Sequence, residues 1–545
     1  MESDAAGRMS VAGEAHSFAK LSAIYRLSES LTQSMARYKK LVLLLTACVF
    51  GLNGVYGALK TPLWFDEFFT FFIAQVSPYR EMLKALPADG QPPLHYLIAR
   101  IFLHLPGPTE LVLRLPDLIA YVAAGLLTYR IARKHADAAQ ALFAAAVVWG
   151  AVMTQSQAIT ARPYTFLLTF TAFAFASWQV ASERQQNRLL PLSGVTLGLA
   201  GAILSHHFGV IHVGLFLAAG EILRLITRRR FDPGMLIAIG AGLLPLVVTL
   251  PLAHQSQAVL GAPVLRDPHF WSKPSWGMLS YYIRTVPLSL LAIVALLTLI
   301  SLADGKRNRS VRDVASVPVH EWGAAAALCF LYLVVLAVSR AGAGFFWPRY
   351  AISTTLGLAL VLGWGLPRVP LLRPVADRLL AAAALIFVSV TAIETTVSEF
   401  RHPVALTQLA QTALSPLLKN APSSQPIVVA NAYEYLPQWW YSSQAIRSRM
   451  TYLSDLSYAE RQQDFVAEAS VTIDRAYLPM PITDYQAFLA RNPRFLLLYS
   501  GTPRLIWIAS RLKSEGWRLT TIAKSRTDTL YQVDAPLAAA TVPRS

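Results

Sequence analysis

Residues 61–70 read TPLWFDEFFT, and this stretch follows directly on the first long apolar run of the chain. Two adjacent carboxylates, Asp66 and Glu67, lie among aromatic residues at what should be a membrane surface. Burying a carboxylate in such surroundings costs free energy unless it is paired with a cation, and an unpaired one usually has a function. The stretch is therefore either a functional site or a solvated loop whose charges only mark the end of a helix.

The composition is that of a membrane protein. Of the 545 residues, 54% are hydrophobic and only 14% are charged, whereas soluble proteins carry about 25% charged residues. The net charge of +17 is spread over short runs between apolar segments, which disfavours a nucleic-acid surface. Cys48 and Cys329 both lie inside apolar runs, so neither a disulfide framework nor a structural zinc site is expected.

Apolar runs long enough to cross a bilayer recur along most of the chain. A spanning helix needs about 20 mostly apolar residues. By that rule we predict about eleven spans, at 40–59, 111–132, 138–156, 163–181, 189–205, 207–226, 234–253, 277–302, 321–340, 349–366 and 378–397. The shorter apolar run at 92–105 is interpreted as an interfacial helix.

Basic residues alternate between loops and so predict the orientation. Every second loop is rich in Arg and Lys, beginning with Arg37, Lys39 and Lys40, and the loops between them are poor in both. Cytoplasmic loops carry this excess. Counting 92–105 as a span would invert every later loop, which supports leaving it out.

Three regions follow from this topology. Residues 1–39 are predicted to be a cytoplasmic tail, and residues 40–397 a transmembrane catalytic domain with a long first outer loop at 60–110. An odd number of spans places the C-terminus outside. Residues 398–545 are therefore predicted to form a small extracytoplasmic α/β domain, with strands near 427–430, 495–499, 519–523 and 529–533 and helices near 405–418, 457–469 and 503–516.

The outer turns gather residues suited to phosphate chemistry. Besides Asp66 and Glu67, they hold Gln91, His95, Arg114, Arg162, Tyr164, His206, His207, Lys273, Arg349 and Tyr350. Each also has a simpler interpretation: arginines extend to lipid headgroups, histidines cap helices, and aromatic residues line the membrane interface. Together, a carboxylate that accepts a proton and arginines that neutralise a departing phosphate suit transfer from a phosphate-linked donor.

Five short motifs resemble those of membrane glycosyltransferases of the GT-C fold, in particular the bacterial protein-mannosyltransferase-like and aminoarabinose-transferase-like enzymes. WFDE at 64–67 is similar to the Asp-Glu motif of their first outer loop. QPPLHY at 91–96 and RLP at 114–116 resemble the segments that follow it. ARPY at 161–164 and PRY at 348–350 resemble two later turns. The resemblance covers roughly residues 40–397.

This resemblance implies an inverting transfer of a sugar from a polyprenyl-phosphate donor to a hydroxyl of a lipid, glycan or protein, on the periplasmic face of a bacterial inner membrane. It implies that Asp66 is the catalytic base and that Glu67 orients the acceptor or holds Asp66. Arg349 would contact the donor phosphate, assisted by Arg162, Tyr164 and Lys273. No cofactor is required, and no residue pattern points to a metal site, although some GT-C enzymes use a divalent cation.

Two other classes of function remain open from the sequence. A transporter or flippase of lipid-linked glycans would carry charged or broken sites near the middle of the bilayer, often in repeated halves. A non-catalytic receptor would bind through its outer α/β domain and would leave Asp66 and the scattered arginines without a role.

Overall fold

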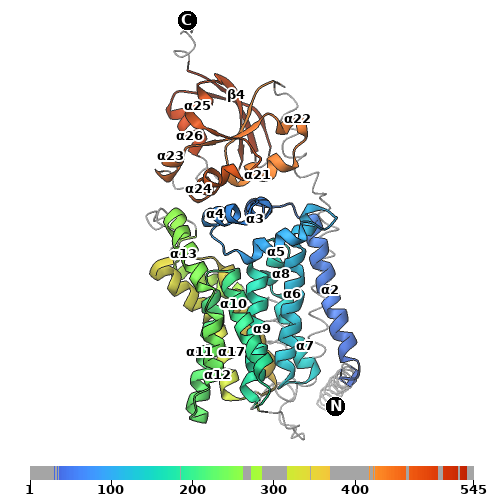
Figure 1. Cartoon of the computed structure of the whole chain (residues 1–545). Helices are drawn as coiled ribbons and strands as arrows, with labels where there is room; N and C mark the ends of the chain where they lie inside the picture. The colour runs from blue at the N-terminus through green and yellow to red at the C-terminus, as the bar shows by residue number, and fades with distance from the viewer. Residues whose placement is uncertain are drawn as a thin grey trace, which may run out of the picture.

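The computed structural model describes residues 36–184, 186–261, 272–284, 316–343, 345–368, 424–461, 465–500, 507–525 and 528–536, with a few isolated positions besides. Most of the described residues up to 368 lie in a bundle of apolar helices, and the described C-terminal residues form an α/β unit stacked on one end of it (Figure 1). The predicted boundary between the two near residue 398 falls outside the described ranges.

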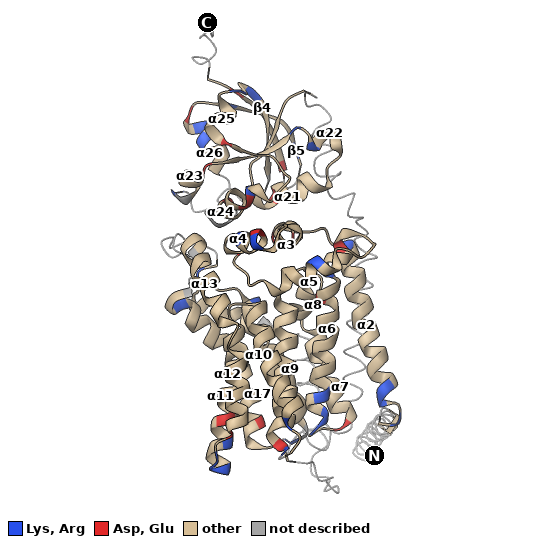
Figure 2. Ribbon diagram, in the orientation of Figure 1, with Lys and Arg blue, Asp and Glu red and all other residues tan. Residues whose placement is uncertain are grey.

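The bundle is built from apolar helices of different lengths, some of which follow one another as bent pairs. They are α2 (Lys39–Lys60), α6 (Thr109–Arg133), α7 (Ala138–Gly150), α8 (Val152–Ala158), α9 (Tyr164–Glu183), α10 (Leu189–Ser205), α11 (Gly209–Arg228), α12 (Pro233–Gly242), α13 (Leu246–Ser256), α17 (Val319–Val338) and α18 (Thr354–Gly365). Figure 2 shows their charged residues near the two ends of the bundle and few between them, as a membrane-embedded middle requires.

Within the described ranges, five helices are long and apolar enough to cross a membrane, and up to seven if each bent pair is one span. The predicted span at 138–156 is broken between α7 and α8, which meet at 61°, and the one at 234–253 is bent by 42° between α12 and α13. Two others are the shorter apolar helices α10 and α18. The span at 378–397 and most of 277–302 lie outside the described residues, so the number eleven stays a prediction.

The first long loop covers one end of the bundle. It contains α3 (Phe65–Gln75), α4 (Tyr79–Asp89) and α5 (Leu94–Phe102). The nine-residue α5 is too short to span a bilayer, as expected for the run at 92–105. In Figure 1, α3 and α4 lie across the bundle end, between the helices below and the C-terminal unit above.

The C-terminal unit contains one six-stranded sheet in the order β3-β2-β1-β4-β6-β5. The strands β1 to β4 run parallel, and β5 and β6 form an antiparallel pair beside β4. The four predicted strands are confirmed, and two further short strands complete the sheet; the set is β1 (Ile427–Val429), β2 (Met450–Ser454), β3 (Ile482–Asp484), β4 (Arg494–Ser500), β5 (Arg518–Lys524) and β6 (Asp528–Asp534).

Helices pack beside this sheet. They are α21 (Ala432–Tyr441), α22 (Gln444–Arg447), α23 (Leu456–Arg461), α24 (Phe465–Ile473), the 3-10 turn η6 (Asp474–Ala476), α25 (Tyr485–Leu489) and α26 (Trp507–Ser514). The helices predicted at 457–469 and 503–516 correspond to α23 with α24 and to α26, and the one at 405–418 lies almost wholly outside the described residues.

The C-terminal unit and the first loop share one hydrophobic core. Trp440 of α21 packs against Phe68, Phe71 and Phe72 of α3, with ring centroids 5.3–6.0 Å apart. The Tyr441 hydroxyl accepts from the Leu63 amide at 2.8 Å and donates to Glu110 at 2.9 Å. Aromatic burial of this kind dominates interface energetics, so the α/β unit is docked on the loop that carries Asp66.

Candidate active site

A cavity of about 370 Å³ lies where the bundle end, the first loop and the C-terminal unit meet. The first loop contributes Trp64, Phe65, Asp66, Phe69, Ala88, Asp89, Gly90 and Gln91, the bundle end contributes Arg162, Tyr164, His206, His207, Phe208, Arg349 and Tyr350 among others, and the C-terminal unit contributes Tyr433 and Ser470. Segments far apart in the sequence therefore build one site.

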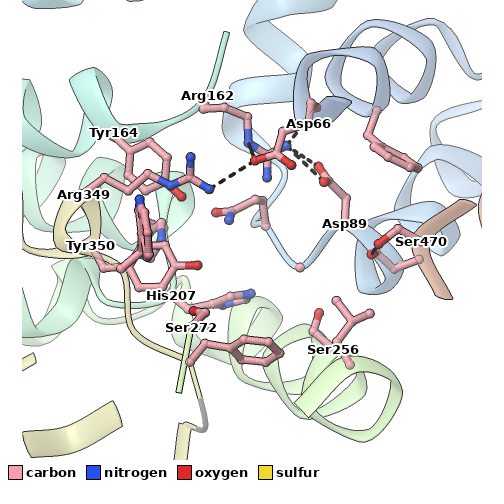
Figure 3. A pocket seen from close by; sticks show the side chains of 18 of the residues that line it. Asp66, Asp89, Arg162, Tyr164, His207, Ser256, Ser272, Arg349, Tyr350 and Ser470 are labelled. Atoms are coloured by element: carbon pink, nitrogen blue, oxygen red, sulfur yellow. Dashed lines mark hydrogen bonds and ion pairs between the residues drawn. The ribbon is translucent and has the colours of Figure 1, made fainter. Parts of the chain in front are cut away.

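Asp66 lies between two arginines on the cavity wall (Figure 3). Arg349 Nη2 donates to Asp66 Oδ2 at 3.1 Å, and Arg162 Nε lies 4.0 Å from the same oxygen. The Asp66 side chain keeps 19% of its surface exposed. A ligand in the cavity can therefore contact the Asp66 carboxylate, and the two arginines balance its negative charge.

The start of α3 fixes the direction of Asp66. The Glu67 side chain caps the start of this helix: its Oε2 accepts from the Trp64 amide at 3.0 Å, while the Glu67 amide donates to the Trp64 backbone carbonyl at 2.9 Å. Asp66 is therefore held in the first helical turn, where the positive end of the helix dipole stabilises a negative charge.

Glu67 faces away from the cavity and is 1% exposed. Arg114 donates to both of its oxygens, at 2.7 and 2.6 Å, and the Ala161 amide donates to Oε1 at 2.7 Å. Arg114 also donates to the carbonyls of Ala58, Thr61 and Pro62. The pair fastens the end of α2 and the start of α3, so both residues position the site rather than line it.

Two other predicted binding residues also lie away from the cavity wall. His95 Nε2 contacts Asp117 Oδ2 at 3.0 Å inside the protein, and that carboxylate accepts from Thr165 at 2.8 Å. Lys273 is partly buried beside the cavity-lining Ser272. Gln91, Arg162, Tyr164, His206, His207, Arg349 and Tyr350 do line the cavity, as the sequence placed them together.

Aromatic rings form one side of the cavity. Tyr164 and Tyr350 are stacked with centroids 6.0 Å apart, and His206 lies 5.3 Å from Tyr350. The Arg349 guanidinium is 5.1 Å from the Tyr164 ring centroid. Burial, with the nearby His207, His212, Arg162 and Arg349, holds the pKa of His206 well below its usual value. His206 is therefore a neutral aromatic partner, and the positive charge of the site comes from the arginines.

Asp89, Tyr433 and Ser470 line the cavity although the sequence analysis did not select them. Asp89 ends α4, and both of its carboxylate oxygens accept from Arg162 Nη1, at 3.0 and 2.7 Å. Its position directly before Gly90 and the QPPLHY motif is the one sequence signal that pointed to it. Tyr433 and Ser470 reach the cavity only because the C-terminal unit is docked above it.

A second polar cluster lies at the opposite end of the bundle. His135, Glu183 and Glu321 place ligand atoms within 4.8 Å of one another. The Lys134 amine already contacts Glu183 at 2.8 Å and Glu321 at 3.2 Å. A lysine in the middle of such a group supplies the positive charge that a metal would bring, so we describe the cluster as an ion-pair network.

Comparisons with known proteins agree with this architecture. Residues 90–253 match the family model described as dolichyl-phosphate-mannose-protein mannosyltransferase, and no curated protein sequence matches the chain. Two crystal structures of ArnT from Cupriavidus metallidurans are similar to the whole chain at 14% identity. The apo form covers 93% of this chain and 100% of its own with a TM-score of 0.56, and the form bound to undecaprenyl phosphate covers 92% and 99% with a TM-score of 0.55. The chain thus has the GT-C fold of membrane glycosyltransferases, and its residues 90–253 are similar in sequence to the dolichyl-phosphate-mannose-protein mannosyltransferase family.

Proposed function

We propose that this protein is an inverting glycosyltransferase that moves a sugar from a polyprenyl-phosphate donor to a hydroxyl of a lipid, glycan or protein acceptor. The proposal rests on the Asp66 carboxylate, which lines a cavity between Arg349 and Arg162. The basic loops predict that this end of the bundle faces away from the cytoplasm. The resemblance to bacterial enzymes implies that this side is the periplasmic face of an inner membrane.

The cavity offers donors without partners. Among the residues that the structure describes, Arg162 Nε, Arg349 Nε and the Tyr164 hydroxyl are buried and make no hydrogen bond. Buried polar atoms are rarely left in this state unless a ligand or water completes them. A phosphate oxygen accepts readily from guanidinium and hydroxyl donors, and ArnT, which shares this fold, was crystallised with undecaprenyl phosphate.

These groups support a single displacement. The acceptor hydroxyl gives its proton to the Asp66 carboxylate as its oxygen attacks the anomeric carbon. The bond from that carbon to the phosphate oxygen breaks, and the electron pair leaves with the polyprenyl phosphate. Arg349 and Arg162 neutralise the charge that builds on this leaving group. Attack from the opposite face inverts the sugar, and the reaction requires no cofactor, although it is compatible with a divalent cation.

The first prediction concerns the base. Asp66→Asn keeps the size of the side chain but cannot accept the proton, so transfer should fall by roughly 10²- to 10⁴-fold. The measurement is release of undecaprenyl phosphate from a panel of undecaprenyl-phosphate sugars by purified protein in nanodiscs, with a membrane extract as acceptor. Turnover near that of wild type would overturn the assignment. If the protein in vesicles instead moved a fluorescent undecaprenyl-phosphate sugar from one leaflet of the membrane to the other without transferring the sugar, a flippase would be favoured.

The second prediction concerns the phosphate. Arg349→Ala removes a charged donor, so affinity for undecaprenyl phosphate should fall roughly 10- to 100-fold. Arg340→Ala is the matched control, because Arg340 is exposed at the same end of the bundle and stacks on Trp276 rather than lining the cavity. Equal affinities for the two variants, measured by titration with undecaprenyl phosphate in nanodiscs, would contradict the role of Arg349.

A further inference from the structure

Arg162 is shared unequally between two carboxylates of the cavity (Figure 3). Its Nη1 donates to both oxygens of Asp89, at 3.0 and 2.7 Å. Its Nε lies 4.0 Å from Asp66 Oδ2, and its contact with the Asp66 backbone carbonyl is a long 3.3 Å. Arg162 is therefore bound to Asp89 and only near the Asp66 carboxylate.

The distance of 4.0 Å from Arg162 Nε to Asp66 Oδ2 is about 1 Å too long for a hydrogen bond, since such bonds average about 2.9 Å. Within the described residues, Arg162 Nε is buried and has no other partner. A small shift of the guanidinium would satisfy this donor on Asp66. Arg162 Nη1 also contacts Thr70 Oγ1 at a long 3.5 Å. Its bonds to Asp89 are the shortest that it makes and the ones to a charged group, so they oppose the shift most strongly.

Asp89 is itself held in place. It is the last residue of α4, which Gly90 ends in the left-handed conformation with φ of 73°. The Tyr96 hydroxyl donates to Asp89 Oδ2. The Asp89 side chain is only 6% exposed, so its geometry is set by the protein rather than by solvent.

We propose that Asp89 is a positioning residue that holds Arg162 short of a hydrogen-bonded ion pair with Asp66. This inference rests on the proposed function, because it assigns Asp89 the task of keeping the base free. Asp66 then has one close arginine, Arg349, and that arginine turns to the donor phosphate when the donor binds. An Asp66 carboxylate paired closely with both arginines would be a weaker base.

Other charged and titratable groups lie near Asp66, Asp89 and Arg162, but none of those described below holds Arg162 as Asp89 does. Burial opposes the charge of Arg162, but Asp89 and Asp66 hold its pKa well above the usual value, so it stays cationic. Burial and Asp89 raise the pKa of Asp474 to about 8, so that acid adds little negative charge at neutral pH. The remaining groups that face the two carboxylates are Arg349, Tyr164 and Tyr350 around Asp66, and Tyr96 beside Asp89.

The test is the pH dependence of Asp89→Asn. Without the carboxylate, Arg162 should close on Asp66, which lowers turnover roughly 10- to 100-fold and moves the acid limb of the pH–rate profile down by about one pH unit. Asp89→Glu keeps the charge and should leave the acid limb near that of wild type. Asp232→Asn is the matched control, because Asp232 is likewise a carboxylate paired with arginine, contacting Arg188 and Arg224 at the far end of the bundle.

A second readout does not depend on turnover. A carbodiimide with a small amine labels a carboxyl only in its protonated form, so the extent of labelling at Asp66, measured by mass spectrometry against pH, reports its proton affinity. The half-labelling pH should fall in Asp89→Asn and stay in place in Asp232→Asn and Asp89→Glu. An unchanged half-labelling pH in Asp89→Asn, or an equal fall in Asp232→Asn, would overturn the inference. If wild type transfers no sugar while labelling shifts as expected, the proposed function fails and the positioning role stands.

Discussion

Asp66 and Glu67 are neighbours in the sequence with opposite surroundings. Asp66 lines the cavity and is partly exposed, whereas Glu67 is buried and accepts hydrogen bonds from Arg114 and two backbone amides. One step along the first turn of α3 rotates the side chain by about 100°. The two carboxylates of the motif therefore have separate tasks, one for chemistry and one for holding the loop.

Glu67→Gln should destabilise the fold strongly. The change removes the negative charge opposite Arg114, whose side chain is fully buried, and breaking a buried pair by removing one partner costs about 3–5 kcal/mol. We expect a fall of that size in the free energy of unfolding, measured by detergent-unfolding titration. Glu81→Gln is the control, because the Glu81–Lys84 pair is exposed to solvent and such pairs contribute little to the free energy of unfolding. Similar unfolding curves for the two variants would contradict the structural role of Glu67.

At the scale of residues, the sequence predicted which groups meet but not how they pair. The motifs at 64–67, 161–164 and 348–350 placed Asp66, Arg162 and Arg349 on one face, and the structure brings them together. Arg114 was expected at the substrate, and Glu67 either at the acceptor or holding Asp66. Their spacing in the sequence carries no sign of a buried ion pair between α3 and α6. Such pairing depends on the depth of each side chain, which a pattern of types does not contain.

At the scale of elements, α4 is clamped between the bundle and the C-terminal unit. The Ser470 hydroxyl of α24 donates to the Ala88 carbonyl at 3.0 Å. The turn η6 that follows places Asp474 in the interior, 1% exposed, and neither of its oxygens has a hydrogen-bond partner among the described residues. The unit thus carries a buried acid next to the segment that presents Asp89.

This acid makes stability depend on pH. Burial and Asp89 raise the pKa of Asp474 from 3.8 to about 8 in the folded protein. The folded state therefore binds one more proton than the unfolded state between these values, and stability falls as pH rises through that window. Buried His206 has the opposite effect below about pH 6.5, because its pKa is lowered in the folded protein. The wild-type melting temperature should therefore drop from pH 6.5 to pH 8, and Asp474→Asn should remove most of the drop.

The matched control for this prediction is Asp484→Asn, because Asp484 is an exposed helix cap and Asn caps equally well. Its melting temperature should follow wild type across the same pH range, measured in the same detergent. A wild-type melting temperature that does not change from pH 6.5 to pH 8 would contradict the conclusion that Asp474 holds a proton in the folded protein.

At the scale of the whole molecule, the hydrophobic pattern predicted the helical bundle and four of the six strands. Periodicity and length carry that information directly. The bends within 138–156 and 234–253 were not visible, because each apolar run continues through its break. The strands β2 and β3 were also missed. β1 is as short as β3, but its three residues are all apolar and β-branched, whereas β2 (MTYLS) and β3 (ITD) mix polar and apolar residues.

The residues that complete the cavity were the hardest to predict. Tyr433 and Ser470 lie more than 350 positions after Asp66 in a unit whose own pattern is that of an ordinary α/β protein. Their arrival at the site depends on how that unit docks, and the docking is decided by the shared aromatic core around Trp440. No local sequence signal reports a contact of that range.

The shared core of the first loop and the C-terminal unit also sets how this protein can be divided. Since α3 and α4 pack on α21 and α24 as well as on the bundle, the boundary of a transferable module does not coincide with the exit of the chain from the membrane. A chimera that exchanges only the α/β unit would match a foreign surface to the native Phe68 and Phe72. The unit that can be exchanged between proteins of this fold includes residues 61–93 together with the C-terminal domain, although the two are separated by most of the sequence.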